Sequence, residues 1–225
     1  DEYNFRLGIF IARQRYIQEF NKRPGNTFKV GLNKFSCYTP SEYQTLLGYR
    51  KDTKNLYKPE KTKSTTNTLP DNVDWRDSGV VNAIKDQAQC GSCWAFSAVA
   101  TCESAYAIKT GTLLSFSEQN LVDCDPSSFG CNGGTPSYAI DYIIKDQNGQ
   151  FNSEVDYPYT ASEGTCSFDS SKAIGKVTSY YLVFFHSESD LFYKVAQTGV
   201  VSVGIDASLA SFHSYSSGIY QDSSC

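Results

Sequence analysis

The sequence predicts an α+β protein in which helices come first and strands follow. Two stretches, Asp1–Asn21 and Cys93–Thr110, space their apolar residues as helices do. Toward the C-terminal end, Gly175–Phe185 and Val200–Ile205 have the composition of strands and enclose a helix expected over Ser187–Gln197. At 225 residues, of which 40% are hydrophobic, the chain is long enough for a substantial core.

The N-terminal part is expected to be mainly helical. In Asp1–Asn21, Phe10 and Ile17 lie seven residues apart, and further apolar residues widen their stripe into an amphipathic face. A Pro-Gly-Asn turn ends this helix, although the same spacing also fits a plain surface helix. Phe28–Leu32 is expected as a short strand and Pro40–Leu47 as a short helix.

Charge is distributed unevenly along the chain. Residues 1–68 carry 13 Lys and Arg against 6 Asp and Glu, a net +7, and the remainder carries 7 against 18, a net −11. Such a split fits a basic arm for nucleic acid or membranes, or two halves that bind each other. Arg50–Thr68 is polar and basic, which predicts a flexible linker open to proteolysis. No run approaches the roughly 18 apolar residues of a membrane span.

The chain is organised around the sequence QAQCGSCWAFSAVATCESAYAIKT, residues 87–110. Gly91 and Ser92 form a turn into a capped helix start at Cys93, and Gly111 stands where the helix should stop. Unpaired N–H groups and the dipole at a helix N-terminus favour a thiolate over a thiol. Because the thiolate is the reactive form, Cys93 is a candidate nucleophile.

Two shorter helices are expected after the central one, over Ser117–Cys124 and Thr135–Asp146. The loop between them contains Gly130, Gly133 and Gly134, which would let an extended peptide approach the backbone and pair with it strand to strand. The same glycines also fit an ordinary turn.

A Cys-x-x-Cys pair such as Cys90 and Cys93 also occurs in redox enzymes and in zinc sites. A zinc site would need a second pair, or histidines at ligand spacing, and the sequence has only His186 and His213 and no other such pair. The sequence therefore predicts no metal or other cofactor. On this motif alone, a redox role stays an alternative.

The motif CGSCW at residues 90–94 resembles the sequence around the catalytic cysteine of papain-like cysteine peptidases. A second resemblance, near the N-terminus, is to the inhibitory propeptide of the cathepsin L-like branch. Residues that match its two motifs are Glu2, Arg6, Phe10, Ile17 and Asn21, followed by Gly31, Asn33 and Phe35. Arg13 stands in place of an asparagine of the first motif, and Cys37 in place of an aspartate of the second.

The resemblance implies an α+β, papain-like two-lobe fold. Its helical first lobe would precede a β-rich second lobe that is incomplete at the C-terminus, and a mainly helical propeptide would come before both. Residues 1–68 would form the inhibitory propeptide with its basic linker, and residues 69–225 the peptidase domain, so that the mature chain begins near Leu69 or Pro70. The opposite charges of the two parts then fit an intramolecular inhibitor that acid releases.

The resemblance also implies roles for individual residues. Cys93 is the nucleophile, and the side chain of Gln87 helps to hold the oxyanion that forms during attack. Asn132, Gly133 and Gly134 would hold the substrate backbone, although Asn132 equally fits a turn. The residues expected to line the second specificity subsite are Thr135, Pro136 and Gly204. The glycine in that group suggests room for a bulky apolar or aromatic side chain.

Most of the cysteines are expected to be structural. The disulfides implied by matched positions are Cys90–Cys131 and Cys124–Cys166. Sequence spacing alone cannot choose these pairs. Cys102 lies within the central helix and is expected to be a buried free thiol, whereas Cys37 is a candidate exposed thiol. Eight cysteines suggest an oxidising or lysosome-like compartment.

The histidines of the sequence are expected to be non-catalytic. In the family, the catalytic His and Asn follow the cysteine by about 130–150 residues, a window that opens near Cys225. His186 and His213 fall short of it and are expected on the surface, and Tyr157 and Tyr159, in a motif of the family, are expected to pack. Cys225 resembles half of a third disulfide. A polypeptide that ends there is expected to lack its base and to have little or no peptidase activity.

We therefore expect a cysteine-type endopeptidase proenzyme that hydrolyses peptide bonds by thiolate attack and a thioester intermediate. Its partners would be peptide or protein substrates and its own propeptide, residues 1–68, with a monomer as the expected state and neither nucleic acid nor a membrane. The expected location is a lysosome, another acidic vesicle or the secreted fraction, with any signal peptide outside this sequence. The alternatives are an inactive homologue that binds peptides or inhibits proteases, and a Cys-x-x-Cys thiol oxidoreductase.

Overall fold

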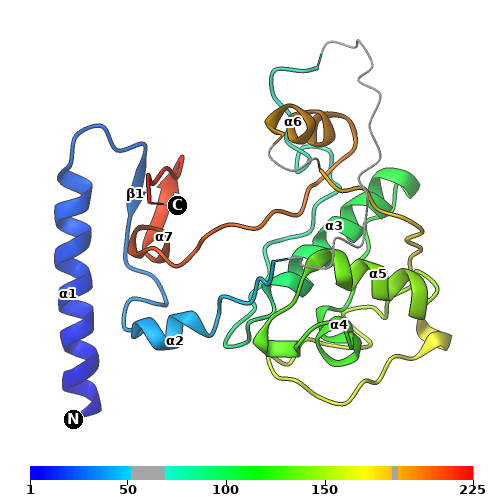
Figure 1. Cartoon of the computed structure of the whole chain (residues 1–225), viewed down its shortest axis with the longest axis horizontal. Helices are drawn as coiled ribbons and strands as arrows, with labels where there is room; N and C mark the ends of the chain where they lie inside the picture. The colour runs from blue at the N-terminus through cyan, green and yellow to red at the C-terminus, as the bar shows by residue number, and fades with distance from the viewer. Residues whose placement is uncertain (52–68, 184–186, 225) are drawn as a thin grey trace. The chain divides into compact units, whose positions relative to one another are not determined.

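The computed structural model describes residues 1–51, 69–183 and 187–224, and the chain forms two compact units (Figure 1). The first unit combines Asp1–Leu47 with Gly204–Cys225. The second unit consists of Gly48–Val203. Each unit has a hydrophobic cluster of its own.

The elements of the first unit are α1 (Glu2–Lys22), β1 (Phe28–Val30), α2 (Pro40–Gln44), α7 (Ala210–His213) and β2 (Tyr215–Gly218). The two strands pair in antiparallel fashion, with Phe28 opposite Gly218 and Val30 opposite Tyr215. A register shift between Lys29 and Val30 interrupts the pairing. In Figure 1 the strands lie side by side although they come from opposite ends of the sequence.

Helix α1 packs on this sheet through part of its apolar face. The buried cluster comprises Phe20, Phe28 and Val30, with Tyr16, Ile17 and Tyr220 packed against it. Asn21 continues the pairing of β1 with its side chain, because its Nδ2 donates to the Val30 carbonyl at 2.8 Å and the Val30 N–H donates to its Oδ1 at 3.1 Å. The apolar face and one amide thus fix the helix to the strand.

Helix α2 is short, and a capping box fixes its first turn. The hydroxyl of Thr39 accepts from the N–H of Glu42, whose carboxylate accepts from the N–H of Thr39. Arg6 of α1 donates from both terminal nitrogens to the same carboxylate, with Nη2 and Oε1 2.6 Å apart. The bonds from Arg6 and then from Thr39 lower the pKa of Glu42 to about 2. Arg6 therefore links α1 to α2.

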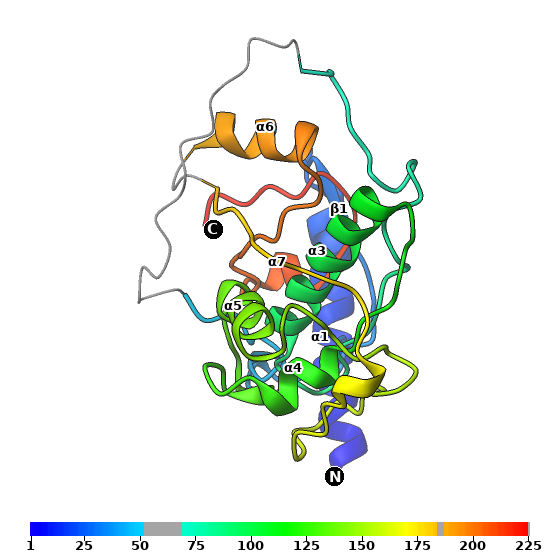
Figure 2. The same ribbon diagram turned by 90° about the vertical axis from the view of Figure 1, so that its right-hand side faces the viewer.

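The elements of the second unit are α3 (Cys93–Thr110), α4 (Glu118–Cys124), the 3-10 turn η1 (Gly130–Asn132), α5 (Pro136–Asp146), the 3-10 turn η2 (Ser170–Lys172) and α6 (Glu188–Gln197). Helix α3 packs against α4 and α5, which stay beside it in both views (Figure 1, Figure 2). Its buried face includes Ala95, Ala98 and Val99, whose small side chains allow this close packing. The helix ends at Gly111, whose φ of 76° is a left-handed conformation that glycine adopts without strain.

The helices predicted from the sequence are present, with small shifts at their ends. Ser117 and Ser187 cap α4 and α6, since their hydroxyls accept from the N–H groups of Asn120 and Asp190. In the first unit, α2 ends before the predicted Leu47.

The strands predicted over Gly175–Phe185 and Val200–Ile205 are not formed. All of these residues that the structure describes lie outside regular secondary structure, and Phe184 and Phe185 are not among the described residues. A strand is stabilised by pairing with a neighbour, and within residues 1–51, 69–183 and 187–224 these stretches have no partner strand. The α+β fold is accordingly mostly helical, with little sheet.

Three predictions fall outside the described residues. They concern residues 52–68 of the linker predicted over Arg50–Thr68, the predicted surface position of His186 and the predicted pairing of Cys225. Among the residues that the structure does describe, no helix is both long and apolar enough to cross a membrane.

Candidate active site

Cys93 is the first residue of α3, as the sequence predicts. The preceding Ser92 does not cap the helix with its side chain, because its hydroxyl is bonded to the hydroxyl of Tyr159 at 2.6 Å. The following Trp94 is buried and donates from its ring N–H to the carbonyl of Gly130 at 3.1 Å. Contacts on both sides therefore hold the start of the helix in place.

Gln87 lies in the loop before Cys93, and its side-chain amide donates to the carbonyl of Cys90 at 2.8 Å. The hydroxyl of Tyr159 donates to the backbone carbonyl of Gln87, also at 2.8 Å. The Tyr159 ring packs edge-on against Phe96, with 4.8 Å between ring centroids. Tyr159 thus packs as predicted, but its hydroxyl also ties the Gln87 loop to the residue before Cys93, which the sequence did not indicate.

Two disulfides support the site, and they have the pairing that the resemblance implies. They are Cys90–Cys131 and Cys124–Cys166. The first joins the residues before α3 to the glycine loop that follows α4. Beside it, the N–H of Gly91 donates to the carbonyl of Cys131 at 2.9 Å. The cysteine loop and the glycine loop are therefore held together by one covalent bond and one hydrogen bond.

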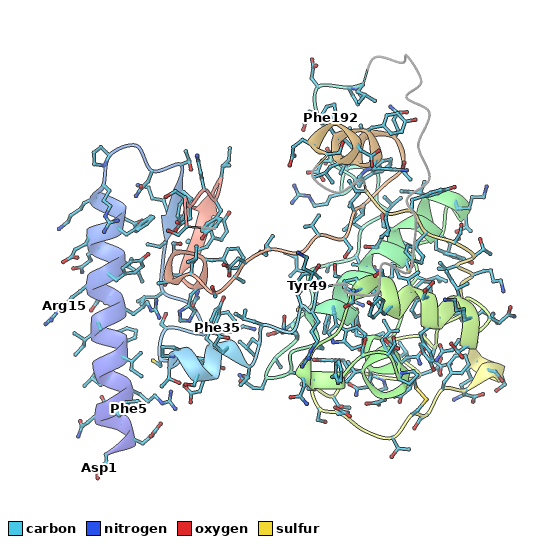
Figure 3. The ribbon with its side chains drawn as sticks, in the orientation of Figure 1. Asp1, Phe5, Arg15, Phe35, Tyr49 and Phe192 are labelled. Atoms are coloured by element: carbon cyan, nitrogen blue, oxygen red, sulfur yellow. A yellow bond between two sulfur atoms is a disulfide. The ribbon has the colours of Figure 1, made fainter. Side chains whose placement is uncertain are left out.

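An extended piece of the N-terminal part of the chain lies on the glycine loop. The N–H of Gly134 donates to the carbonyl of Gly48 at 2.9 Å, and the N–H of Arg50 donates to the carbonyl of Gly134 at 2.8 Å. These bonds place Tyr49, labelled in Figure 3, opposite Gly134 in a parallel bridge. The hydroxyl of Thr135 donates to the carbonyl of Arg50 at 2.6 Å. The loop therefore binds an extended segment, Gly48–Arg50, strand to strand.

Two glycines make this close approach possible. A Cβ at Gly48 would lie 1.8 Å from the carbonyl oxygen of Gly91. A Cβ at Gly133 would lie 2.6 Å from the carbonyl oxygen of Gly48. Backbone atoms cannot withdraw as the end of a flexible side chain can, so both positions require glycine.

The protonation state of Cys93 depends on its partial burial beside Gly48. Burial raises the pKa of the Cys93 thiol, and the backbone N–H groups of Gly48, Trp94 and Cys93 itself partly offset that rise. The helix N-terminus thus acts in the direction that the sequence predicts, but the loss of water outweighs it. In this closed form the thiol, rather than the thiolate, is favoured.

The other residues predicted to bind substrate lie in both units. Asn132 ends η1, and its backbone carbonyl accepts from the side chain of Arg50 at 2.8 and 3.1 Å. Pro136 is the first residue of α5. Gly204 belongs to the first unit, where it is exposed and outside regular secondary structure. The predicted residues that gather around Gly48–Arg50 are Asn132, Gly133, Gly134 and Thr135.

Two residues of this site were not predicted. The guanidinium carbon of Arg50 lies 4.3 Å from the ring centroid of Phe129, within cation–π distance. The sequence indicated this contact only weakly. Phe129 could simply be an aromatic residue before a glycine loop, and Arg50 could simply be one of the basic residues of the linker.

The surface position predicted for His213 is wrong. His213 is only 7% exposed, and its Nε2 lies 3.2 Å from the carbonyl oxygen of Phe35. Its ring packs on Tyr43, with 4.1 Å between ring centroids. Burial, and then the charge of Arg13, lower the pKa of His213 to about 4. The imidazole is therefore neutral and part of the core of the first unit.

The free cysteines other than Cys93 differ in exposure. Cys102 is buried, as predicted, and burial raises the pKa of its thiol to about 12. Cys37 is half-buried rather than openly exposed, and its carbonyl accepts from Arg6 at 3.0 Å.

Sequence comparison relates both parts of the chain to known domains. Residues 69–225 match the papain family cysteine protease domain, and residues 1–43 match the cathepsin propeptide inhibitor domain (I29). A relative, "Digestive cysteine proteinase 1" of Homarus americanus, is 40% identical over 234 residues, which cover all of this chain and 71% of the relative. "Cathepsin S" of Bos taurus is 42% identical over 204 residues, covering 89% of this chain and 61% of its own length.

The fold also matches solved structures of precursors. The digestive procathepsin L2 proteinase from Tenebrio molitor larval midgut superposes with a TM-score of 0.92 at 34% sequence identity. The match covers all of this chain and 74% of that one. This chain therefore has the fold of a procathepsin over the length that it spans.

Proposed function

Because this chain belongs to the papain family of cysteine proteases and carries a cathepsin propeptide inhibitor domain, we propose that it is the proenzyme of a cysteine endopeptidase. Residues 1–68 serve as the inhibitory propeptide with its linker, residues 69–225 belong to the peptidase domain, and maturation occurs near Leu69 or Pro70. Its substrates are peptides and proteins, and it acts as a monomer. The relatives named digestive proteinase and cathepsin support a secreted or lysosomal location.

The reaction begins at Cys93. The thiol passes its proton to an imidazole base, to which no described residue is assigned, and the thiolate then attacks the carbonyl carbon of the scissile peptide bond. A C–S bond forms, and the carbonyl oxygen becomes an oxyanion held by the N–H of Cys93 and the amide of Gln87. As this intermediate collapses, the imidazolium gives its proton to the leaving nitrogen, the C–N bond breaks, and the amine departs to leave a thioester. Water then attacks the thioester, which frees the acid and restores the thiol. His213 is not assigned as the base, since it is buried against Phe35 in the first unit.

The pairing of Gly48–Arg50 with the glycine loop is the observation that carries this proposal. In this pairing the N–H and the carbonyl of Gly134 both bind an extended backbone, as a substrate would require, next to the half-buried nucleophile Cys93. A substrate would take the same two hydrogen bonds once the segment has left. The segment therefore inhibits by occupying the site that it protects.

The roles of Cys93 and Gln87 can be tested in the matured full-length protein. We expect Cys93→Ser to abolish cleavage of unfolded protein substrates and to remove the acyl adduct that mass spectrometry detects on the Cys93 peptide after rapid acid quenching. Gln87→Ala should lower kcat by about 10²–10³, with a small change in KM, because one oxyanion donor is lost.

Thiol labelling separates this proposal from its alternatives. A peptidase predicts one reactive cysteine in the matured protein, Cys93, because Cys90 is already bonded to Cys131. Labelling that appears on Cys90 and Cys93 together after mild reduction, with disulfide exchange activity, would instead support an oxidoreductase. A matured protein that binds peptides tightly and never forms the acyl adduct would be an inactive homologue.

A further inference from the structure

The side chain of Arg50 makes two kinds of contact beside the glycine loop. Its guanidinium carbon lies 4.3 Å from the centroid of the Phe129 ring. Its Nε and Nη2 donate to the backbone carbonyl of Asn132 at 3.1 and 2.8 Å. The guanidinium is therefore bound by the face of an aromatic ring and by a carbonyl oxygen at its edge.

These two groups select for positive charge. The face of an aromatic ring carries the negative part of its quadrupole and attracts a cation. A carbonyl oxygen only accepts hydrogen bonds, and Arg or Lys supplies donors without an acceptor of its own. A neutral amide can give the carbonyl a hydrogen bond but gains no cation–π attraction, and a carboxylate is repelled by both groups.

The backbone pairing fixes which residue of a bound peptide reaches this place. Gly48 lies at Cys93, Tyr49 lies opposite Gly134, and Arg50 follows, with its N–H on the Gly134 carbonyl. We propose that Phe129 and the Asn132 carbonyl form a subsite for a basic side chain of the substrate, two residues from the residue whose carbonyl Cys93 attacks. In the proenzyme, Arg50 occupies that subsite.

This inference rests on the proposed function, and it deepens that function by naming a substrate class. Peptides with Arg or Lys at the stated position are preferred over peptides with a neutral or acidic residue there. The aromatic ring of Phe129 is the source of this preference for a positive charge. Because Phe129 is 58% exposed even beneath Arg50, it can be substituted without disturbing the core of the unit.

Substrate scanning with the matured full-length protein tests the subsite. The probes are one peptide series with a single Arg, Lys, Gln or Glu placed in turn at each position from three before to three after the cleaved bond. We expect kcat/KM to favour Arg and Lys over Gln by roughly threefold to tenfold at a single position, two residues from the attacked one. Phe129→Leu should bring that ratio close to one, and Phe129→Tyr, which keeps the aromatic face, should retain it. Equal rates for Arg and Gln in the wild type, or a preference that survives Phe129→Leu, would overturn the proposal.

A binding measurement makes the test independent of turnover. The probe is a synthetic peptide of residues 44–51, bound to the matured Cys93→Ser protein. Replacing Arg50 of the peptide by Gln should weaken binding roughly threefold to tenfold, replacement by Lys should weaken it less, and both differences should vanish on Phe129→Leu. If no peptide is cleaved but this pattern is found, the peptidase function fails and the subsite stands. If peptides are cleaved and Gln binds as well as Arg, only the subsite fails.

Discussion

Gly48 lies so close to Gly91 that only a hydrogen atom fits between them, since a Cβ there would lie 1.8 Å from the Gly91 oxygen. We expect Gly48→Ala to displace the Gly48–Arg50 segment, because both groups in the clash belong to backbone that the disulfide and the loop hold in place. Cys93 would then react with an iodoacetamide reagent at least about tenfold faster in the unprocessed protein, with the labelled peptide identified by mass spectrometry, since burial no longer suppresses its thiolate.

Gly8→Ala is the matched control for that change. Gly8 lies in α1, and a Cβ there would meet nothing within 4 Å. Its labelling rate should equal that of the wild type. Equal rates in Gly48→Ala and wild type would show that the segment does not protect Cys93.

Some individual residues could be placed from the sequence, and others could not. The position of Cys93 at a helix start could be predicted because the signals for that start are local in sequence. His213 was misplaced because its burial depends on Phe35 and Tyr43, which are remote in the sequence. Arg50 and Phe129 acquire their role only through contact with each other, so neither residue type carried the signal alone.

Among the elements, helices were predictable and strands were not. A helix makes its hydrogen bonds within itself, so spacing, caps and a terminal glycine were sufficient for α3 and α4. A strand needs a partner, and the composition of Gly175–Phe185 and Val200–Ile205 indicated β-structure without indicating a neighbour. β1 does form, because β2 and the side chain of Asn21 satisfy its backbone.

Helices α3 and α4 are joined by a half-buried cation. The ammonium of Lys85 lies 2.7 Å from Oε1 of Glu118 and 3.1 Å from Oε1 of Glu103. Burial raises the pKa of Glu118 to about 8, and the two carboxylates raise the pKa of Lys85 against the effect of burial. The ammonium therefore gives both buried carboxyl groups a hydrogen-bond donor.

Lys85→Met should lower the free energy of unfolding by about 1–3 kcal/mol at neutral pH, because two buried carboxyl groups lose the ammonium that donates to them. Denaturant titration measures this loss. Lys145→Met is the control, since its partner Asp141 is one helical turn away and Lys145 is 65% exposed. That change should cost less than about 0.5 kcal/mol. A loss of the same size in both variants would contradict the role given to Lys85.

For the whole molecule, the compact units do not follow the order of the sequence. The predicted boundary after residue 68 separates propeptide from enzyme, yet the first unit combines residues from both sides of it. Two residues of α1 contribute to this unit. Arg13 donates to the hydroxyl of Ser214 in the C-terminal segment at 3.3 Å, and Asn21 bonds to β1, the strand that pairs with β2 of that segment. The side chain of Asn33 donates to the carbonyl of His213 at 2.7 Å. Motif matching identified both parts, but it could not reveal that they share a sheet.

This shared unit should weaken in acid, and His213 is the group responsible. It faces the cation Arg13 from α1, the phenol of Tyr43 from α2 and the carbonyl of Phe35. Its pKa is lowered from 6.5 to about 4 in the folded unit, so the opened unit binds the proton more strongly. Stability is complete above about pH 6.5 and falls by up to about 1.4 kcal/mol per pH unit until about pH 4. The Arg6–Glu42 pair persists through this window, because the pKa of Glu42 is about 2.

Hydrogen exchange of the Gly31 amide, which donates to the carbonyl of Ser214 at 2.7 Å, reports on that opening. Corrected for the intrinsic effect of pH on exchange, its protection in the wild type should fall between pH 6.5 and 4, and His213→Gln should show a much flatter dependence. Arg13→Gln should also flatten it, because the pKa of His213 moves back toward its ordinary value. The same fall in all three proteins would assign the acid response to other groups, such as the carboxylates behind the +7 and −11 charge split.

The pairing of β1 with β2 cannot form until late in synthesis on the ribosome. Phe28 leaves the exit tunnel early, but its partner Gly218 is added only after the residues between them have been made. At about 5–20 residues per second, that interval is on the order of 10–40 s. Until then α1 has no sheet to cover, and its aromatic residues are available to chaperones. Helix α1, which is made before the other elements described here, is thus among the last of them to reach its final contacts.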